Sequence, residues 1–413
     1  MFKKTLCINL LFLSIIGTAQ VMWQFKKDTV ITWNYFDGDE FNGNKVDTDK
    51  WKYWYGWSRS IFSNKEQQYY TDGENHILAN GILGLTAIKK PITAKMVDWL
   101  KDEDTIKNGK NFYSLNKTSF EYKAGMIETK KAYMNGFFEC RFKLPKQKGF
   151  WPAFWLHGGD PNEEIDIMEC KSERTDQIHI DTHCPNRCDD ISYLFQKRSY
   201  GGWVKTRDNF TEEYAVIACD WDKHQVRFYL DGECIGVSNV NFNVEKYLTL
   251  NIAVPSNNGP FKPGPDVNDT SVVVFEVDYV RVWKKESNND VLKNNALQLV
   301  NANTNIQASK LLSAKSITKT KSKLVYGKKS DHKFGEIFIS CFINKDNIQI
   351  TSLGLFQKNK LNYKILSIDN KEIASGIIEN QIFNISKSTL VIGEYIILIN
   401  FNNKQVQKQF KVN

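Results

Sequence analysis

The stretch that decides the fold reads Glu-Ile-Asp-Ile-Met-Glu and spans residues 164–169. It contains Glu164, Asp166 and Glu169, and every residue between these acids is apolar. Alternating acidic and apolar side chains predict a β-strand with one face in the core and the other lined by carboxylates. Close carboxylates repel one another and raise each other's pKa. The strand is therefore either a solvated acidic face or a paired acid and nucleophile of the kind that cuts glycosidic bonds.

The spacing of the acids predicts an irregularity within this strand. Glu164 and Asp166 share a face by simple alternation, whereas Glu169 lies five positions after Glu164 and would point the other way. One extra residue at Ile167-Met168, a β-bulge, turns Glu169 back to the acidic face, and bulges are frequent beside active sites. We therefore expect a bulge here. The spacing admits both the ~5–5.5 Å carboxylate gap of a retaining glycosidase and the ~6.5–9.5 Å gap of an inverting one.

In a retaining mechanism the acids would take complementary roles. One glutamate would attack the anomeric carbon, and the other, held protonated by its neighbours, would donate to the leaving oxygen. Asp166 lies between them, where it can hydrogen-bond to the nucleophile and couple the two titrations.

An aromatic run precedes the acidic strand. Residues 149–156 include Trp151 and Trp155, which share a strand face because they are four positions apart. Aromatic faces stack on the apolar faces of sugar rings, so two tryptophans beside three acids favour a saccharide subsite. Core packing is the alternative for both side chains.

The rest of the chain predicts an all-β protein. Residues 30–283 show short alternating strands broken by Gly, Asn and Asp, including a hairpin turn at Asp231-Gly232. We expect a jelly-roll β-sandwich domain over 25–286, with a long insertion at 91–122. An Asn- and Ser-rich linker should cover 287–324, and a small β-sandwich-like domain, which lacks tryptophan, should cover 325–413.

The N-terminus resembles a secretory signal peptide. Residues 1–19 combine two early lysines, an apolar segment and a small-residue cleavage site. No later segment is apolar and long enough to span a membrane. We therefore expect a secreted or cell-surface protein. Of the seven cysteines that would remain, Cys184 and Cys188 can close a tight loop as a disulfide. A zinc site with His179 and His183 would need a second cysteine pair at ligand spacing, which is missing.

Charge and composition restrict the partners. The net charge of +8 is spread along the chain without an arginine-rich stripe, which argues against nucleic-acid binding. The chemistry of paired carboxylates requires no cofactor. We expect a monomer whose partner is a polysaccharide.

The acidic strand and the tryptophan run resemble glycoside hydrolase family 16. That family's signature is Glu-x-Asp-x-(x)-Glu on a jelly-roll strand, preceded by a Trp-Pro-Ala-x-Trp run. The six-residue form here is similar to the bulged branch that holds laminarinases, agarases and carrageenases. Residues 39–43, 66–71 and 278–282 are also similar to family segments, so the resemblance covers most of 30–285.

The resemblance implies roles for individual residues. Glu164 would be the nucleophile, Asp166 its assistant and Glu169 the acid/base. His183 matches a family histidine near the leaving group, with a plain loop histidine as the alternative. The predicted substrate-binding residues are Trp57, Trp151, Trp155 and His183. Some members bind a structural calcium ion, for which the matching positions are Glu40, Gly43 and Asp278.

The resemblance also implies the reaction. We expect a secreted retaining endo-hydrolase of β-1,3-glucan, with a marine galactan (agar, porphyran or carrageenan) or a non-catalytic lectin-like jelly roll as alternatives. Two departures from the laminarinase pattern concern the substrate: Met126 stands where that group has Arg, and Gln67 where it has Leu.

The C-terminal part is similar to Por-type secretion sorting tails. The similarity rests on residues 369–373, 385–386 and 393–396. It implies contact with a secretion machinery. An accessory carbohydrate-binding domain is the alternative.

Overall fold

The computed structural model describes residues 21–25, 29–98, 117–159, 163–184, 201–206, 208–286, 337–343, 346–353, 361–378, 382–401 and 404–412. The predicted signal peptide and linker lie outside these ranges. In the described part of the chain, the helical segments are two single 3₁₀ turns, η1 (Phe62–Asn64) and η3 (Lys387–Thr389). None of them is long and apolar enough to span a membrane. The prediction of an all-β protein is confirmed.

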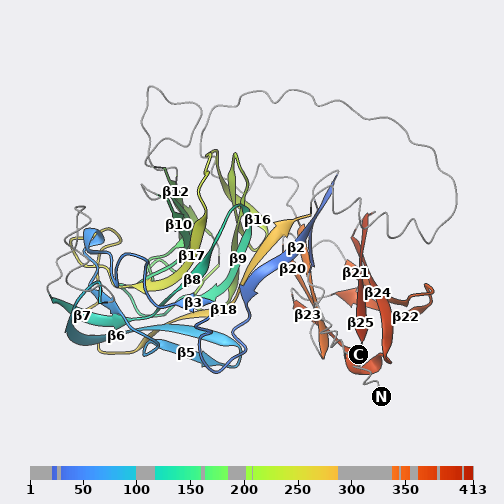
Figure 1. Ribbon diagram of the computed structural model, residues 1–413, viewed down its shortest axis with the longest axis horizontal. Helices are drawn as coiled ribbons and strands as arrows, with labels where there is room; N and C mark the ends of the chain where they lie inside the picture. Colours follow the sequence, from blue (N-terminus) through green and yellow to red (C-terminus); the bar gives the residue numbers. More distant parts are fainter. Residues whose placement is uncertain are drawn as a thin grey trace, which may run out of the picture. The chain divides into compact units, whose positions relative to one another are not determined.

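The chain divides into a larger unit, Gln24–Ile337 with Leu353–Leu355, and a smaller unit that includes Phe338–Ser352 and Phe356–Asn413. Strand β1 (Val21–Phe25) begins the described chain. Two sheets form the larger unit (Figure 1). The first has seven strands in the order β13 (Gly202–Lys205), β12 (Gln177–His183), β11 (Glu163–Glu169), β10 (Trp151–Gly158), β17 (Lys246–Ala253), β8 (Met126–Tyr133) and β3 (Trp51–Lys52).

The second sheet of the larger unit is built around one long strand. This strand, β18 (Val273–Lys285), pairs with three others. The remaining strands in order are β16 (Glu233–Ser238), β15 (Val226–Leu230), β14 (Ala215–Trp221), β9 (Gly136–Lys143), then β18 and β2 (Val30–Asp39), with β6 (Ile82–Ala94), β5 (His76–Ala79), β7 (Thr118–Ala124) and β4 (Gln68–Tyr70) branching from β18.

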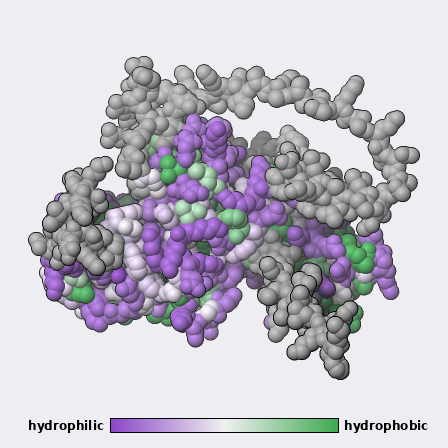
Figure 2. Space-filling model, viewed as in Figure 1, coloured by the Kyte–Doolittle hydropathy of each residue, from purple (hydrophilic) through white to green (hydrophobic). Residues whose placement is uncertain are grey.

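The core lies between these sheets because each strand alternates its side chains. On β10, Phe154 and Leu156 point into the core cluster, and Phe138 and Phe142 of β9 meet them from the second sheet. The outward positions of β9 include the charged side chains of Arg141 and Lys143. Figure 2 accordingly shows hydrophilic side chains over most of the visible face of the larger unit, with small hydrophobic patches.

Three cysteine thiols belong to this core. Cys140, Cys170 and Cys219 are free and buried. Burial raises the pKa of each thiol well above its usual range, because the thiolate would lose its hydration.

The acidic strand β11 contains the predicted bulge. Across from β12, Asp166 pairs with Asp181 and Glu169 pairs with His179, so Ile167 and Met168 together face a single residue. Across from β10, the pairing skips Ile167. Both Ile167 and Met168 lie in the core cluster. The bulge at Ile167-Met168 is thereby confirmed, and it leaves Glu169 on the face opposite the core.

Two further local predictions have different outcomes. Asp231 (φ 47°) and Gly232 (φ 84°) are both left-handed and join β15 to β16, which confirms the hairpin turn. The predicted limits of the insertion at 91–122 are wrong. Strand β6 continues to Ala94 and β7 begins at Thr118, with Ile92 paired to Phe120. Backbone pairing between these strands overrides the polar composition of the segment.

A buried ionic group crosses the second sheet. Arg281 of β18 is 1% exposed and binds Glu40 through two hydrogen bonds of 2.7 and 2.8 Å. Its guanidinium also lies 3.8 Å from Glu139, which accepts a hydrogen bond from the indole of Trp283 at 3.1 Å. Burial raises the pKa of Glu139 to about 7, although Arg281 opposes the shift.

The smaller unit contains two sets of paired strands. One is formed by β19 (Ile337–Ile343), β20 (Asn347–Leu353) and β23 (Ile382–Ser386). The other has the order β22 (Glu372–Ile378), β21 (Leu361–Ser367), β24 (Gly393–Phe401) and β25 (Lys404–Val412). Alternate residues such as Ile365, Ile397 and Ile399 are fully buried, so this unit has an apolar interior.

The shifted titration of Glu139 predicts a pH-dependent stability. Its folded-state pKa lies above the unfolded value, so the contribution of the protonated form is complete below about pH 4 and is lost as the pH rises towards 7. Glu139→Gln cannot ionise. From pH 4 to pH 8 we expect it to gain about 3 kcal/mol in free energy of unfolding relative to wild type. Urea unfolding at several pH values measures this gain, and parallel curves for the two proteins would contradict it.

The bulge in β11 predicts how deleting one residue and inserting one residue at this point affect the stability of the fold. Deleting Ile167 restores regular alternation, so the three acids stay on one face, at the loss of one core side chain worth about 2–4 kcal/mol. Inserting an alanine after Met168 is more destabilising, because a retained bulge would turn Glu169 towards the core as a buried unpaired carboxylate, and a regular strand would turn Met168 out of the core into the cleft. Thermal unfolding and a crystal structure of the deletion variant test this. Equal loss of stability in both variants would count against it.

Candidate active site

The seven-stranded sheet carries a cleft of about 500 Å³. Its polar lining comes from alternate positions of adjacent strands, because alternate residues share a face. The described lining residues are Tyr55, Trp57, Ile61, Ser63, Asn64, Glu66, Trp151, Ala153, Trp155, Glu164, Asp166, Glu169, His179, Asp181, His183, Asn251, Ala253, Pro260 and Phe261. The three predicted carboxylates and all four predicted substrate-binding residues therefore meet in one cleft.

Glu164 and Asp166 form a coupled acid pair. Oxygens of both carboxylates and a ring nitrogen of His183 all lie within 4.8 Å of one another. Nε2 of His183 is 3.1 Å from Oδ2 of Asp166 and 3.8 Å from Oδ2 of Asp181. Asp166 is 2% exposed, and burial, then the charges of Glu164 and Glu169, raise its pKa well above its usual range.

Burial also raises the pKa of Glu164, whereas a hydrogen bond from Asp166 opposes that shift. Within this hydrogen bond Asp166 is the donor and Glu164 the acceptor, because the bond raises the pKa of Asp166 and lowers that of Glu164. The contact therefore favours the neutral form of Asp166 and the carboxylate form of Glu164, and a carboxylate is the form that a nucleophile requires.

Glu169 is held by two donors from neighbouring strands. The indole of Trp151 donates to Oε1 at 3.0 Å, and Nδ1 of His179 lies 3.0 Å from Oε2. Both contacts depend on the bulge, since it places Glu169 opposite Ala153 of β10 and His179 of β12. The carboxylate is thus fixed in orientation towards the cleft.

The three tryptophans of the cleft differ in what they expose. Trp57 is 37% exposed and stacks on Tyr55, with ring centroids 5.0 Å apart, so one face is open for a sugar ring. Trp155 lines the floor and donates its indole N–H to Asn251 at 2.8 Å. Trp151 is 8% exposed, and Phe261 covers one of its faces at 4.1 Å. The expected shared strand face of Trp151 and Trp155 is confirmed.

Several cleft residues were not predicted from the sequence. His179 and Asp181 follow from the alternation of β12, in which they share a face with His183. Phe261 lies in the segment after β17 and has no local sequence signal. Glu66 also lines the cleft, and burial raises its pKa to about 7 against hydrogen bonds from Gln68, Asn64 and the amide of Ile61.

The predicted cysteine loop is described only at its beginning. Cys184 follows β12, is buried and forms a disulfide. Its predicted partner, Cys188, lies outside the described residues. The disulfide sits one residue after His183 and so fixes the chain next to a cleft side chain.

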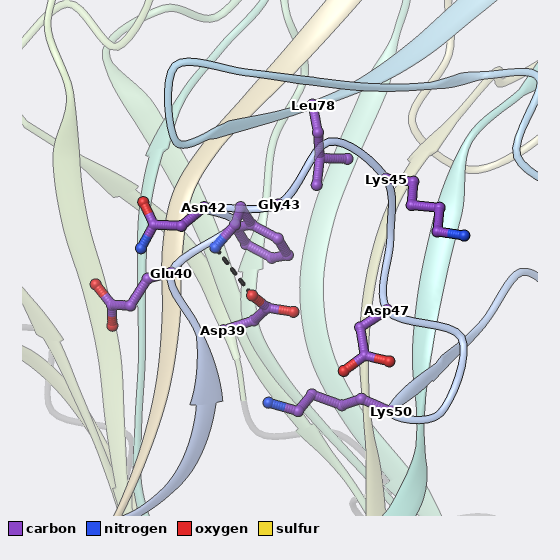
Figure 3. Close-up of a pocket in the computed structure, with 9 residues that line it drawn as sticks. Asp39, Glu40, Asn42, Gly43, Lys45, Asp47, Lys50 and Leu78 are labelled. Carbon is purple, nitrogen blue, oxygen red and sulfur yellow. Dashed lines mark hydrogen bonds between the residues drawn. The ribbon is translucent and has the colours of Figure 1, made fainter. Parts of the chain in front are cut away.

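The residues predicted to hold calcium do not converge. Glu40 and Gly43 line a hollow with Asp39, Asp47 and Lys50, and Figure 3 shows the Glu40 carboxylate pointing away from those two aspartates. Glu40 is paired with Arg281. Asp278 is not among the lining residues of the hollow, and its carboxylate is paired with Arg141.

Glu40, Gly43 and Asp278 do not fit a calcium site in this arrangement, because both carboxylates are paired with arginines. Asp39 accepts from the indole of Trp51 at 2.8 Å and from the amide of Phe41 at 2.9 Å. Its oxygens therefore already stabilise the turn. Calcium at these positions stays a prediction from the resemblance, and no step of the chemistry below depends on it.

A protein-family model matches most of the larger unit. Residues 36–285 match the domain model described as the family 16 glycoside hydrolase domain of β-porphyranases A–D. The chain is 29% identical over 277 residues to a glucan endo-1,3-β-glucosidase of Cryptopygus antarcticus, which covers 59% of this chain and 90% of that protein. It is 26% identical to glucan endo-1,3-β-glucosidase A1 of Niallia circulans, over 60% of this chain and 37% of that protein.

Solved structures agree in fold. The endo-β-1,3-glucanase of Pyrococcus furiosus superposes with a TM-score of 0.50 at 26% identity, covering 62% of this chain and 96% of that one. A structure described with endo-acting O-glycanases of the human gut microbiota gives 0.51 at 28% identity, covering 63% and 94%. With the domain model matching more than half of its length, this chain belongs to glycoside hydrolase family 16.

Proposed function

We propose that the larger unit is a retaining endo-hydrolase of a β-linked polysaccharide and that its substrate is a β-1,3-glucan. The observation that carries the reaction is the bulged strand β11, which presents Glu164, Asp166 and Glu169 together on the floor of an aromatic cleft. Two glutamates flanking one site are the groups that double displacement requires.

The roles follow from the contacts of each acid. Glu164, which accepts a hydrogen bond from Asp166, attacks the anomeric carbon and forms a covalent glycosyl–enzyme ester. Glu169, oriented by Trp151 and His179, gives its proton to the leaving oxygen. It then takes a proton from the water that hydrolyses the ester.

The charge of the cleft supports a neutral substrate. Five carboxylates line it, from Glu66, Glu164, Asp166, Glu169 and Asp181. Among the described lining residues there is no lysine or arginine. A sulfated sugar bound here would meet like charges without a cation to pair with its sulfate, which is unfavourable in a desolvated site. The glucanase relatives from Cryptopygus antarcticus and Pyrococcus furiosus support a glucan.

A sulfated galactan of the porphyran type is the second candidate. It is favoured by the matching domain model, which is described for β-porphyranases. In that case the sulfate would be paired outside the described lining of the cleft.

Export from the cytoplasm remains a prediction. It rests on the N-terminal sequence, which lies outside the described residues, and it suits an enzyme whose polymeric substrate is too large to enter a cell.

Substitution of the two glutamates tests the mechanism. Glu169→Gln cannot protonate the leaving oxygen, so we expect kcat on the polysaccharide to fall by about 10²–10⁴-fold. Glu164→Gln removes the nucleophile and should lose at least as much. Glu212→Gln changes a glutamate whose side chain is 57% exposed and should behave as wild type. Full activity in either cleft variant would refute the assignment.

Azide separates the two roles in the matching alanine variants. With an activated aryl glycoside, Glu164→Ala should give a glycosyl azide of inverted configuration, because azide attacks in place of the carboxylate. Glu169→Ala should give the retained configuration, because azide attacks the glycosyl–enzyme. The reverse pattern would exchange the roles of the two acids.

A polysaccharide panel tests the substrate. We expect release of oligosaccharides from laminarin, and the cleft charge predicts neutral agarose ahead of porphyran and carrageenan. Product sizes measured by chromatography distinguish endo-cleavage from cleavage at chain ends. Preferred cleavage of porphyran would overturn the charge argument and select the second candidate.

A further inference from the structure

Phe261 is an aromatic group of the cleft that the mechanism above does not use. It lies in the segment that follows β17, is half-buried and lines the cleft with Trp151 and His179. Its ring stacks flat on Trp151, with centroids 4.1 Å apart and planes at 3°. Its edge meets His179 at 5.8 Å and 89°. Phe261 is thus part of the surroundings of Glu169, since both of these neighbours contact that carboxylate.

The backbone at Phe261 is held in an unfavourable conformation. Its φ of 58° is left-handed, a region that a bulky residue seldom adopts. Such strain persists only where the surrounding structure imposes it, and it concentrates at functional sites. Two contacts hold the segment that carries Phe261. The ammonium group of Lys171 donates to the carbonyl of Lys262. A Cβ atom at Gly149 would lie 2.4 Å from Pro265, so the segment packs directly on the chain that enters β10.

The position of Phe261 across the sheet places it on the leaving-group side. Pairing of β10 with β11 sets His157 opposite Glu164 and Ala153 opposite Glu169. Trp57 packs against His157, with ring centroids 4.8 Å apart, and so belongs to the Glu164 end. Phe261 belongs to the Glu169 end. Because Glu169 protonates the leaving oxygen, the sugar that departs must lie nearest this end.

A second aromatic ring adjoins Phe261. Trp203 of β13 lies 5.6 Å from it and 5.2 Å from His179. Arg174 sits over Trp203 at 4.8 Å and steadies it from outside the cleft lining. Trp151 is only 8% exposed whereas Phe261 is half-buried, so Phe261 is the more open of the two stacked rings that line this end of the cleft.

We propose that Phe261, supported by Trp203, forms the saccharide subsite for the leaving group, and that the same subsite later receives an acceptor sugar. The proposal rests on the retaining mechanism proposed above. The ligand is a pyranose whose apolar face packs on the ring, with its departing hydroxyl directed at Glu169.

The two uses of the subsite follow from one balanced sequence. Glu164 attacks the anomeric carbon, the bond to the leaving oxygen breaks, and Glu169 transfers its proton to that oxygen. In the second step an acceptor hydroxyl attacks the same carbon, Glu169 takes its proton, and the ester bond to Glu164 breaks. A sugar on Phe261 favours transfer over hydrolysis because it competes with water for this step.

A comparison of two donors tests the subsite. The first is the polysaccharide that wild type cleaves. The second is the β-glycosyl fluoride of a released oligosaccharide, whose leaving group needs no sugar subsite. For Phe261→Ala we expect kcat/KM on the polysaccharide to fall about tenfold or more, the effect of uncovering one Phe side chain. The rate on the fluoride should change less than twofold. The fraction of transfer product with added acceptor oligosaccharide should also fall.

Matched variants keep the test decisive. Phe261→Tyr retains the ring and should restore most of the polysaccharide activity and transfer that Phe261→Ala loses. Val267→Ala removes a 65% exposed side chain near the same segment that is not part of the cleft lining. It should leave the rates on both donors and the fraction of transfer product unchanged. Trp57→Ala should slow both donors, since it lies at the other end. Thermal unfolding of each variant identifies any that fails to fold.

The outcomes separate the two proposals. Absence of cleavage of any polysaccharide by wild type would contradict the proposed function. With an active wild type, equal losses on both donors in Phe261→Ala, or an unchanged transfer fraction, would overturn the leaving-group subsite alone.

Discussion

Three carboxylates lie close together on one face of β11, and the neighbouring strands β10 and β12 must supply the contacts that stabilise them. Like charges this close cannot all ionise in a partly desolvated cleft. Burial and the charges of the two glutamates raise the pKa of Asp166, and Glu169 has two donors, Trp151 and His179. Each donor comes from a different strand. The carboxylates of β11 therefore require hydrogen-bond donors on β10 and β12. The register of these two strands determines whether the donors reach Glu169.

The bulge connects this polar face to the core behind it. A single extra residue changes the direction of Glu169, but it also sends Ile167 and Met168 into the interior side by side. The interior must then accept two adjacent side chains where a regular strand supplies one. Packing on the hidden face of β11 thereby fixes the spacing of acids on the exposed face, so catalytic geometry and core packing are determined by the same residues.

Much of the site could be predicted because its signals are local. The odd separation of Glu164 and Glu169 predicts a bulge between them if both are to share a face. The even separation of Trp151 and Trp155 predicts that these two side chains lie on the same face. Phe261 could not be predicted, since the segment that carries it is held by contacts with Lys171 and Gly149, which lie 90 and 112 residues before Phe261 in the sequence. The pairing of Glu40 and Asp278 with arginines depends likewise on which strands become neighbours of β18. Similarly, the pairing of Ile92 with Phe120 overrode a polar composition that suggested a loop.

The buried thiols of the larger unit have a consequence for how the protein can be made. Cys140, Cys170 and Cys219 lie between the two sheets, while Cys184, at the end of β12, is in a disulfide. Thiol oxidation proceeds through the thiolate, which burial suppresses at all three positions. Oxidants can reach them only before the sheets close. The yield of correctly bonded protein in an oxidising medium is then set by a race between sheet closure and thiol pairing, whatever the stability of the finished fold.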